Sequence, residues 1–586
     1  MIFRPPMVRS LLCLAALCTL SVASAQETPP AAAPASPDSP AKPVRILRHL
    51  VIGESVEAVQ QTSPAADSAF AVLSHGLASF DAAELNKRLA TGGGRAIDER
   101  LLAAITQVVE AFFRQSEYPA ATAVIPTQNI AEGVVRVIVF LGNRAQSLAA
   151  SEWKIRKINV QGAKWFSESL LREKLKIEQG ETVRYSELDQ AIGWTNNNPF
   201  RRVAVRLDPV PNTGEADLSI AVQDAFPLRL SATVDNGGTE LVGEKRYVAA
   251  VSYGNLWGKD HQVSYQYITT DRPEYYQAHG LDYRVPLSWR HYLQISGSYF
   301  HASPELYGGF FRQDGETITA DLRYTVPLTI GNHSAEVYGA FSFKESNNNL
   351  TWDPQATNVQ VLTSKTNVFQ FSLGASTIRR DSRGAWAFAA TATASPGNIN
   401  SRNTDEAFDA GRFGRGDSAR VGAKATYALL NVSIQRLQSL GHGWDFMSRI
   451  AAQVSEANLL PSEQFTIGGS ASIRGYNENV FAGDHGFVFS SDLLAPAWQT
   501  PLPYLSKRRG PLGTRLLAFF DAGDTSMRRK FGSDSPRVAL ASTGVGVRMN
   551  LASNFSLNAD YGWQLSRLPY AVEERSRLHL RASLSF

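Results

Sequence analysis

The sequence predicts two small α/β domains followed by a sixteen-stranded antiparallel transmembrane β-barrel. Three observations support this prediction. The first 25 residues have the pattern of a secretory leader, and an order of strand, helix, helix, strand, strand occurs twice before residue 225. From Phe226 onward, runs of about ten residues that alternate between apolar and polar side chains replace the helical periods. An exported chain that ends in a membrane-embedded barrel accounts for all three.

Residues 1–25 are predicted to be a signal peptide. A positively charged start is followed by an apolar core at 11–23, which is too short to span a bilayer as a helix, and Ala-Ser-Ala at 23–25 matches a cleavage site. Both cysteines, Cys13 and Cys18, lie in this leader. The mature chain is therefore predicted to have no disulfide and no thiolate metal site. A retained N-terminal membrane anchor is the alternative.

Charge and motif content exclude several classes of function. The formal net charge is +4, and removal of the two leader arginines leaves 58 − 2 = 56 basic against 54 acidic residues, which is far from a nucleic-acid-binding balance. The sequence has no nucleophile-elbow, zinc-protease, Walker or calcium-loop motif, and its ten histidines have no metal-ligand spacing. We therefore expect no enzyme activity, no catalytic residue, no cofactor or metal, and no nucleic-acid partner.

Residues 26–43 are rich in Pro and Ala and are predicted to be a flexible or polyproline-like linker, because proline blocks helix interiors. The first α/β domain follows at 44–145 and opens with a strand-like run. An Asp-Ala-Ala-Glu capping box at 81–84 predicts one helix, and apolar residues at 3–4 spacing over 101–113 predict a second. Two strand-like runs close the domain, at 121–126 and 133–140.

Residues 150–224 repeat this order as a second α/β domain. A strand at 153–160 precedes helices at 167–175 and 185–194. An Asn-Asn-Asn-Pro run at 196–199 then ends the second helix, because the proline cannot continue it. Two strands joined by a turn-rich segment complete the domain, at 202–207 and 216–222.

Residues 226–586 are predicted to form the barrel. Apolar residues, which are predicted to face lipid, alternate with polar ones that face the lumen, for example over 320–328 and over 421–429 with Tyr427, as a wall with a lipid-facing and a water-facing side requires. A soluble β-sandwich would also alternate, but the signal peptide and the length of this region favour a barrel. A barrel of sixteen strands encloses an aqueous lumen. The sixteen candidate strands begin near Phe226, Arg246, His261, Tyr276, His291, Thr317, Ser334, Val368, Ala385, Ala419, Phe446, Gly486, Arg515, Ala539, Phe555 and Ser576.

The loop around Arg474 is the most informative stretch of the barrel region. Gly468, Gly469 and Gly475 permit tight turns that side chains would forbid, and they hold Arg474 and Tyr476 on a constrained segment. The loop lies in the long connection between the eleventh and twelfth candidate strands, so it is predicted to start on the extracellular side. An exposed Gly-rich hairpin is the alternative for so short a motif.

The thirteenth candidate strand offers this loop a partner. It contains Phe519, Asp521 and Gly523, and the pleat places Asp521 on the face opposite Phe520 and Ala522. The Gly-Gly and Arg-Gly-Tyr loop, together with this Phe-x-Asp-x-Gly segment, resembles the loop and wall motifs of the two-partner secretion transporters. This is the TpsB family of haemolysin and adhesin secretion-activation proteins, within the superfamily of outer-membrane barrels that carry POTRA domains.

The resemblance implies a role for each residue of the two motifs. The family's loop folds back into the barrel, so Arg474 would make a charge-assisted contact with Asp521. Gly523 would leave room for the loop backbone, and Tyr476 would pack against the inner wall. The Arg474–Asp521 pair would then act as a conformational latch, because export of a polypeptide must displace or reorganise the loop. Asp492 stands where the family's next strand usually has Glu.

The resemblance extends over about residues 44–586 and implies the function of the domains. The segment from Tyr118 to Gly133 is similar to the end of the family's first POTRA domain, so 44–145 and 150–224 are expected to be two POTRA domains. They would bind a secreted partner protein in the periplasm by adding one of its strands to a sheet edge. The barrel would conduct that partner, a large unfolded exoprotein, across the bacterial outer membrane.

The last strand alternates up to Phe586, which resembles the signal that the barrel assembly machinery recognises. The expected partners are therefore the secreted exoprotein, outer-membrane lipid and that machinery during assembly. Two other functions remain as alternatives. An outer-membrane protein insertase usually carries more POTRA domains than this chain has room for. A diffusion porin or receptor, from another class, would not need the α/β modules.

Overall fold

The computed structural model of the chain falls into two compact units, which divide between Asp224 and Ala225. The predicted leader at 1–25 and linker at 26–43 lie outside the described residues. Within those residues, no helix has the length and apolar character needed to cross a membrane. The structure describes residues 47–53, 59, 71–75, 82–89, 97, 99–116, 122–125, 133–140, 152–210, 215–306, 310–330, 333–352, 359–409, 420–501, 511–530, 537–551, 554–568 and 575–586.

The first α/β domain packs two helices on a four-stranded sheet. The sheet has the order β2-β1-β4-β3, with β1 parallel to both neighbours, and the apolar faces of the helices cover Leu50, Ile52 and Val135. The sequence predicts both helices but not β2, and Asp81 of the predicted capping box lies outside the described residues. The elements are β1 (His49–Gly53), β2 (Ala71–His75), α3 (Ala82–Leu89), α4 (Glu99–Ser116), β3 (Thr122–Val124) and β4 (Val134–Phe140).

The second α/β domain also has a four-stranded sheet, in the order β6-β5-β8-β7, but here β5 is parallel to β8 and antiparallel to β6. Its first helix begins where predicted, because the hydroxyl of Ser167 accepts a hydrogen bond from the backbone N–H of Leu170 at 3.2 Å. The three-residue strand β6 is not predicted by the sequence. The elements are β5 (Glu152–Gln161), α5 (Glu168–Leu175), β6 (Thr182–Arg184), α6 (Tyr185–Thr195), β7 (Arg201–Pro209) and β8 (Glu215–Asp224).

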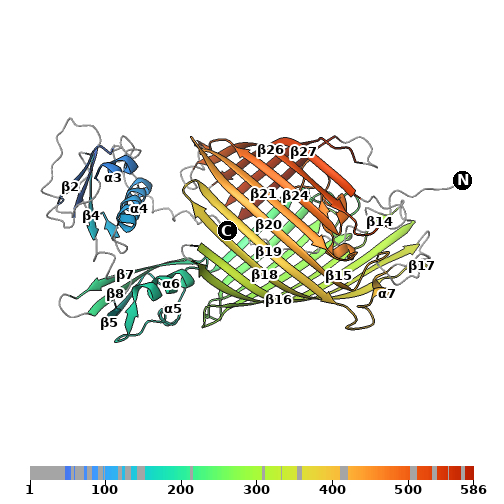
Figure 1. Ribbon diagram of the computed structural model, residues 1–586, viewed down its shortest axis with the longest axis horizontal. Helices are drawn as coiled ribbons and strands as arrows, with labels where there is room; N and C mark the ends of the chain where they lie inside the picture. The colour runs from blue at the N-terminus through green and yellow to red at the C-terminus, as the bar shows by residue number, and fades with distance from the viewer. Residues whose placement is uncertain are drawn as a thin grey trace. The chain divides into compact units, whose positions relative to one another are not determined.

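The second unit is a closed antiparallel barrel (Figure 1). Over the described residues its wall has nineteen strand segments, of which β14, β17 and β25 are short pieces beside strands that also pair past them, so 19 − 3 = 16 strands form the ring. The predicted count is confirmed. The segments are β9 (Leu228–Asp235), β10 (Arg246–Leu256), β11 (His261–Thr270), β12 (Tyr276–Pro286), β13 (Tyr292–Ala302), β14 (Glu305–Leu306), β15 (Phe311–Ile330), β16 (His333–Trp352), β17 (Val359–Leu362), β18 (Lys365–Asp381), β19 (Gly384–Pro396), β20 (Thr426–Gly441), β21 (Trp444–Ser455), β24 (His485–Leu494), β25 (Trp498–Thr500), β26 (Leu512–Ser526), β27 (Arg537–Leu551), β28 (Phe555–Gln564) and β29 (Ser576–Ser585).

The two faces of the wall differ as a membrane barrel requires. On β15, Leu322, Tyr324 and Leu328 are exposed on the outer face, as the alternation predicts. The prediction for 421–429 is wrong. Tyr427 is only 1% exposed and belongs to an apolar cluster with Phe408, at the end of the short helix α7 (Asp405–Phe408), and with Leu459 and Leu460 in the connection that follows β21. Alternation alone does not say which of the two faces is the outer one.

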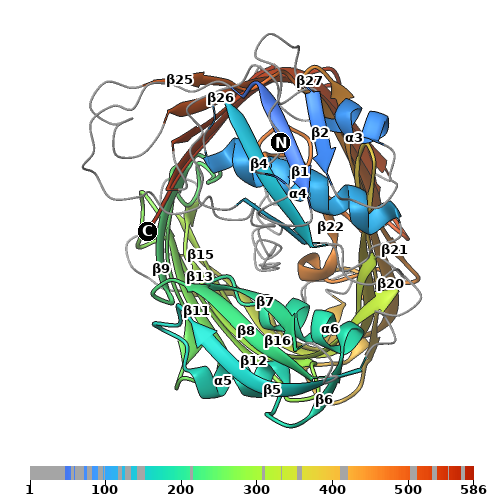
Figure 2. The same cartoon turned by 90° about the vertical axis from the view of Figure 1, so that its left-hand side faces the viewer.

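The connections between strands are unequal at the two ends of the barrel. At the end where β9 begins, most turns are short, as between β15 and β16 or β18 and β19, and exposed tryptophans such as Trp257 and Trp289 lie there. Although residues 495–511 between β24 and β26 are an exception, most of the long connections lie at the opposite end. One of them, residues 456–484 between β21 and β24, is called here the inward loop. It includes a 3-10 turn η3 (Pro461–Glu463) and the hairpin β22 (Phe465–Ile467) and β23 (Phe481–Gly483), and Figure 2 shows β22 inside the ring of strands.

Candidate functional site: the inward loop and the barrel wall

The inward loop joins the eleventh and twelfth strands of the ring, as predicted, and its glycines are used for backbone conformation. Gly468 and Gly469 both have φ of +100° and Gly475 has φ of +88°, which side chains strongly disfavour. The loop is also closed on itself, since the backbone N–H and the hydroxyl of Ser470 both donate to Glu478 at 2.8 Å. Burial raises the pKa of Glu478, and the two bonds from Ser470 partly offset that effect.

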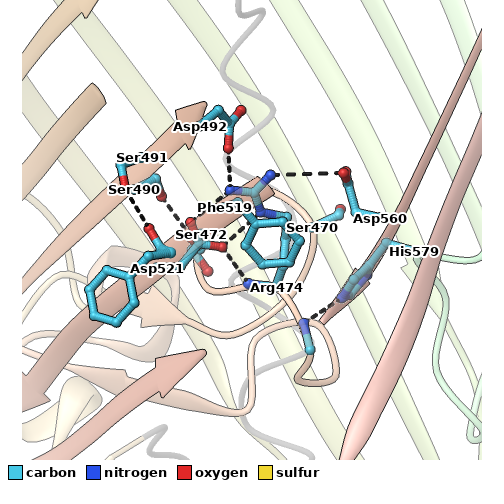
Figure 3. Close-up of polar contacts among 12 residues, drawn as sticks. Ser470, Ser472, Arg474, Ser490, Ser491, Asp492, Phe519, Asp521, Asp560 and His579 are labelled. Carbon is cyan, nitrogen blue, oxygen red and sulfur yellow. Dashed lines mark hydrogen bonds and ion pairs between the residues drawn. The ribbon is translucent and has the colours of Figure 1, made fainter. Parts of the chain in front are cut away.

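The structure brings Arg474 and Asp521 together inside the barrel (Figure 3). The guanidinium is bidentate on the carboxylate, with Nε to Oδ2 at 2.7 Å and Nη2 to Oδ1 at 2.8 Å, and the backbone N–H of Arg474 donates to Oδ2 at 3.0 Å. Asp521 is 0% exposed. A buried contact with this bidentate geometry is of the kind that is strong when made and costly when only one partner is removed.

Three further wall residues surround the same guanidinium. Nη2 of Arg474 also donates to Asp492 on β24 at 2.6 Å, and Nη1 lies 3.9 Å from Asp560 on β28. The guanidinium carbon stands 3.7 Å from the ring centroid of Phe519, which gives a cation–π contact. Burial alone would lower the pKa of Arg474, but the carboxylates outweigh it and raise that pKa, so the side chain stays charged.

The backbone at Gly475 is pinned to the last two strands of the ring. Its N–H donates to Nε2 of His579 on β29 at 3.0 Å, and its carbonyl accepts from the amide of Gln564 at 2.7 Å. Because Nε2 of His579 accepts this bond, the imidazole must be neutral there. The close approach occurs at Gly562 on β28, where an added Cβ would lie 2.7 Å from the backbone N of Gly475.

The expectation that Gly523 makes room for the loop is wrong. A Cβ at Gly523 would meet the backbone of Phe487 and Val488 on the neighbouring strand β24, not the loop. Gly523 therefore permits close strand packing within the wall, and Gly562 is the residue that admits the loop backbone.

Tyr476 packs against the inner wall with its ring buried beside Val488 and Leu540. Its hydroxyl lies 2.8 Å from the carbonyl oxygen of Ala541 and 2.7 Å from that of Ser566, and it accepts from the backbone N–H of Ser566 at 3.3 Å. Burial raises the pKa of Tyr476, so the hydroxyl remains a donor. Arg474, Gly475 and Tyr476 thus contact the wall through three separate sets of partners.

The sequence motifs identified Arg474 and Asp521 but did not identify most of the residues that contact them. Asp492, noted only as a departure from the family's Glu, is a second carboxylate for Arg474. His579 and Gly562 carried no sequence signal, because their positions near the loop depend on strand register across the ring. His485, one residue before the predicted strand start near Gly486, is the first residue of β24, and its Nδ1 accepts from the backbone N–H of Ser455.

The end of the chain closes the ring. Phe586 and Leu230 exchange two backbone hydrogen bonds, at 2.8 and 3.0 Å, beyond a ladder in which β29 pairs with β9 from Arg581 to Ser585. The Phe586 side chain is 63% exposed. In the part of the chain that the structure describes, no three His, Cys, Asp or Glu side chains form a group that could hold a metal ion.

Comparison with known proteins gives a family match over most of the barrel. The family model described as haemolysin secretion/activation protein ShlB/FhaC/HecB matches residues 214–549, which is more than half of the chain. The outer membrane transporter CdiB of Dickeya dadantii is 22% identical over 494 residues, or 82% of this chain and 79% of CdiB. The heme/hemopexin transporter protein HuxB of Haemophilus influenzae is 20% identical over 481 residues, or 79% of this chain and 77% of HuxB.

Solved structures of similar proteins share the fold. CdiB from Escherichia coli aligns with a TM-score of 0.61 at 16% identity over 100% of both chains. CdiB from Acinetobacter baumannii aligns with a TM-score of 0.56 at 16% identity, over 96% of this chain and 95% of the other.

Proposed function

The chain belongs to the haemolysin secretion/activation family, and we propose that it secretes a large partner exoprotein across the outer membrane through its barrel. The family consists of two-partner secretion transporters of the Omp85 superfamily, which are outer-membrane β-barrels and not an enzyme family. The end of the ring with most of the long connections then lies on the extracellular side. The observation that best supports passage of a polypeptide is the inward loop, which is held in the lumen by hydrogen bonds and ion pairs and not by covalent bonds.

The ion pair between Arg474 and Asp521 is the latch of this proposal. A polypeptide that moves through the lumen meets the inward loop, so the loop must swing aside or reorganise. The latch is strong because two carboxylates and an aromatic ring desolvate and balance one guanidinium. It is also reversible, because water can solvate both partners once they separate. No covalent step is involved.

The two α/β domains are proposed to be periplasmic POTRA domains that bind the client. In the second domain, β7 is at the edge of its sheet and pairs only with β8 among the described residues, over Arg201–Pro209. An extended client segment could add a strand along this nine-residue edge. A role as a spacer between the barrel and another component is the alternative for this domain.

The experiment that tests the function is deletion of the gene followed by comparison of surface, medium and periplasmic proteins. We expect one large exoprotein to leave the surface and medium and to accumulate or be degraded in the periplasm, with recovery on re-expression. Loss of many different barrel proteins from the outer membrane would instead favour an insertase. Unchanged protein fractions with impaired uptake of a solute would favour a porin or receptor.

A further inference from the structure

The inward loop has a second buried ion pair, far from Arg474. Glu463, at the end of η3, lies 2.5 Å from Nζ of Lys344 on β16 through its Oε1, and its Oε2 accepts from the amide of Gln370 on β18 at 2.7 Å. Side-chain exposure is 7% for Glu463 and 10% for Lys344. Oε1 also accepts from the hydroxyl of Ser462, so each carboxylate oxygen has a partner.

The surroundings hold this pair rigidly on the wall. The amide of Gln370 also donates to the hydroxyl of Tyr427 on β20, and the amide of Gln453 on β21 donates to the carbonyl of Glu463. Burial alone would raise the pKa of Glu463, but Lys344 and the hydrogen bonds outweigh it and lower that pKa, so the carboxylate is ionised. Four strands of the ring thus contribute to binding residues 456–464, which are called here the base of the inward loop.

The two ion pairs lie on different sides of the barrel. Counted from β9 without the short pieces β14, β17 and β25, β16 is the seventh strand, β26 the thirteenth and β28 the fifteenth. The strands β16 and β28 are therefore eight apart, which is half of a sixteen-strand ring. Since Lys344 is on β16 and Asp560 is on β28, a loop that contacts both must cross the lumen.

We propose that Glu463 and Lys344 form a second anchor, which holds the base of the inward loop on the β16–β18 wall when the Arg474 latch opens. When the latch opens, the tip of the loop (residues 468–480) swings about a fixed base, and the loop as a whole is not released. Glu463 is a positioning residue, because it influences the path of the client indirectly, by holding the loop in place. This effect on export rests on the proposed function, whereas the anchor itself does not.

Two buried wall residues serve as separate probes, because the predicted mature chain has no cysteine. Ser542 faces Asp521 across the β26–β27 ladder and is 0% exposed, so Ser542→Cys reports departure of the tip. Val368 is 2% exposed in the apolar cluster that includes Leu459 and Leu460 of the loop base, so Val368→Cys reports departure of the base. A membrane-impermeant maleimide applied to folded barrels measures each opening.

The anchor predicts which probe responds to which change. Glu463→Gln should raise the labelling rate of Val368→Cys at least tenfold, because it leaves Lys344 buried without its counter-charge, and should leave Ser542→Cys unchanged. Asp521→Asn should raise the labelling rate of Ser542→Cys and leave that of Val368→Cys unchanged. Lys344→Met must reproduce the Glu463→Gln result, and the exchanged pair Glu463→Lys with Lys344→Glu should restore protection. Glu345→Gln, which removes a more exposed ion pair with Lys365 between β16 and β18, is the control.

Equal exposure of both probes by Asp521→Asn alone would overturn the proposal, because the loop would then release as one unit. No change at Val368→Cys in Glu463→Gln and Lys344→Met would overturn it as well. These labelling results do not require a client. If they hold while export by Glu463→Gln is normal, the anchor exists and its role in the proposed export is refuted.

Discussion

Replacement of Asp521 by Asn keeps the size of the side chain and removes its charge. Arg474 then loses the bidentate contact at 2.7 and 2.8 Å but keeps Asp492 at 2.6 Å. Removing one partner of a buried ion pair destabilises the paired state by about 3–5 kcal/mol, and the remaining carboxylate places the expected effect near the lower end. About 3 kcal/mol corresponds to a rise of roughly 100-fold in the ratio of open to latched loop.

The assay is the rate at which Ser542→Cys reacts with a membrane-impermeant maleimide. When closing is faster than labelling, this rate follows the open fraction, so Asp521→Asn should raise it roughly 100-fold. The control is Asp524→Asn on the same strand, whose carboxylate pairs with Arg537, and this variant should label like the parent. Equal rates for Asp521→Asn and the parent, with both barrels folded, would refute the latch.

Four other perturbations test separate parts of the account. Gly562→Ala should open the loop by about 1–3 kcal/mol, because its Cβ would lie 2.7 Å from the backbone of Gly475; unchanged Ser542→Cys labelling would contradict this. Tyr476→Phe removes a hydroxyl that bonds Ala541 and Ser566 and should weaken the latched state by about 1 kcal/mol, or roughly fivefold in the same labelling rate. The pKa of Glu463 is lowered in the folded barrel from its ordinary value of 4.5, so the ionised carboxylate stabilises the anchored loop above pH 4.5, and this stabilisation is lost as pH falls through the lower pKa of the folded state. A spin label at Glu456→Cys should therefore stay immobile from pH 7 to 4.5 and gain mobility only below that range. Deletion of Phe586 removes two backbone hydrogen bonds to Leu230 and should reduce the amount of folded barrel in the outer membrane, measured by heat modifiability, and normal assembly would argue against a terminal signal.

The parts of the fold that depend on local pattern could be predicted from the sequence. The two-residue period gave sixteen strands, with β20 the most displaced, since its predicted start near Ala419 precedes the observed Thr426. The period does not tell the inner face from the outer one, which is why Tyr427 was assigned to the wrong side. The short edge strands β2 and β6 were not predicted, because they depend more on backbone pairing with β1 and β5 than on their own residue types.

The residues of the site also divide into those that a local motif identifies and those that only the topology of the ring brings together. Arg474 and Asp521 are found by motif, but Asp492, Asp560 and His579 join them only because the ring closes in one register and the loop crosses the lumen. Glu463 carried no sequence signal, since nothing near it in sequence indicates Lys344, which lies 119 positions away. Contacts set by topology are not visible in a single sequence.

Cross-linking the inward loop to the wall during secretion tests whether the loop must move for the partner exoprotein to pass. The hydroxyl of Ser490 on β24 donates to the carbonyl of Ser472 in the loop at 3.1 Å, so cysteines at these two positions can be joined by oxidation or by a short thiol-reactive linker. We expect the cross-linked protein to stay in the outer membrane but to export no partner exoprotein, and we expect a reductant to restore export of the oxidised form. Export at the parent's rate with the loop fully cross-linked would contradict this expectation.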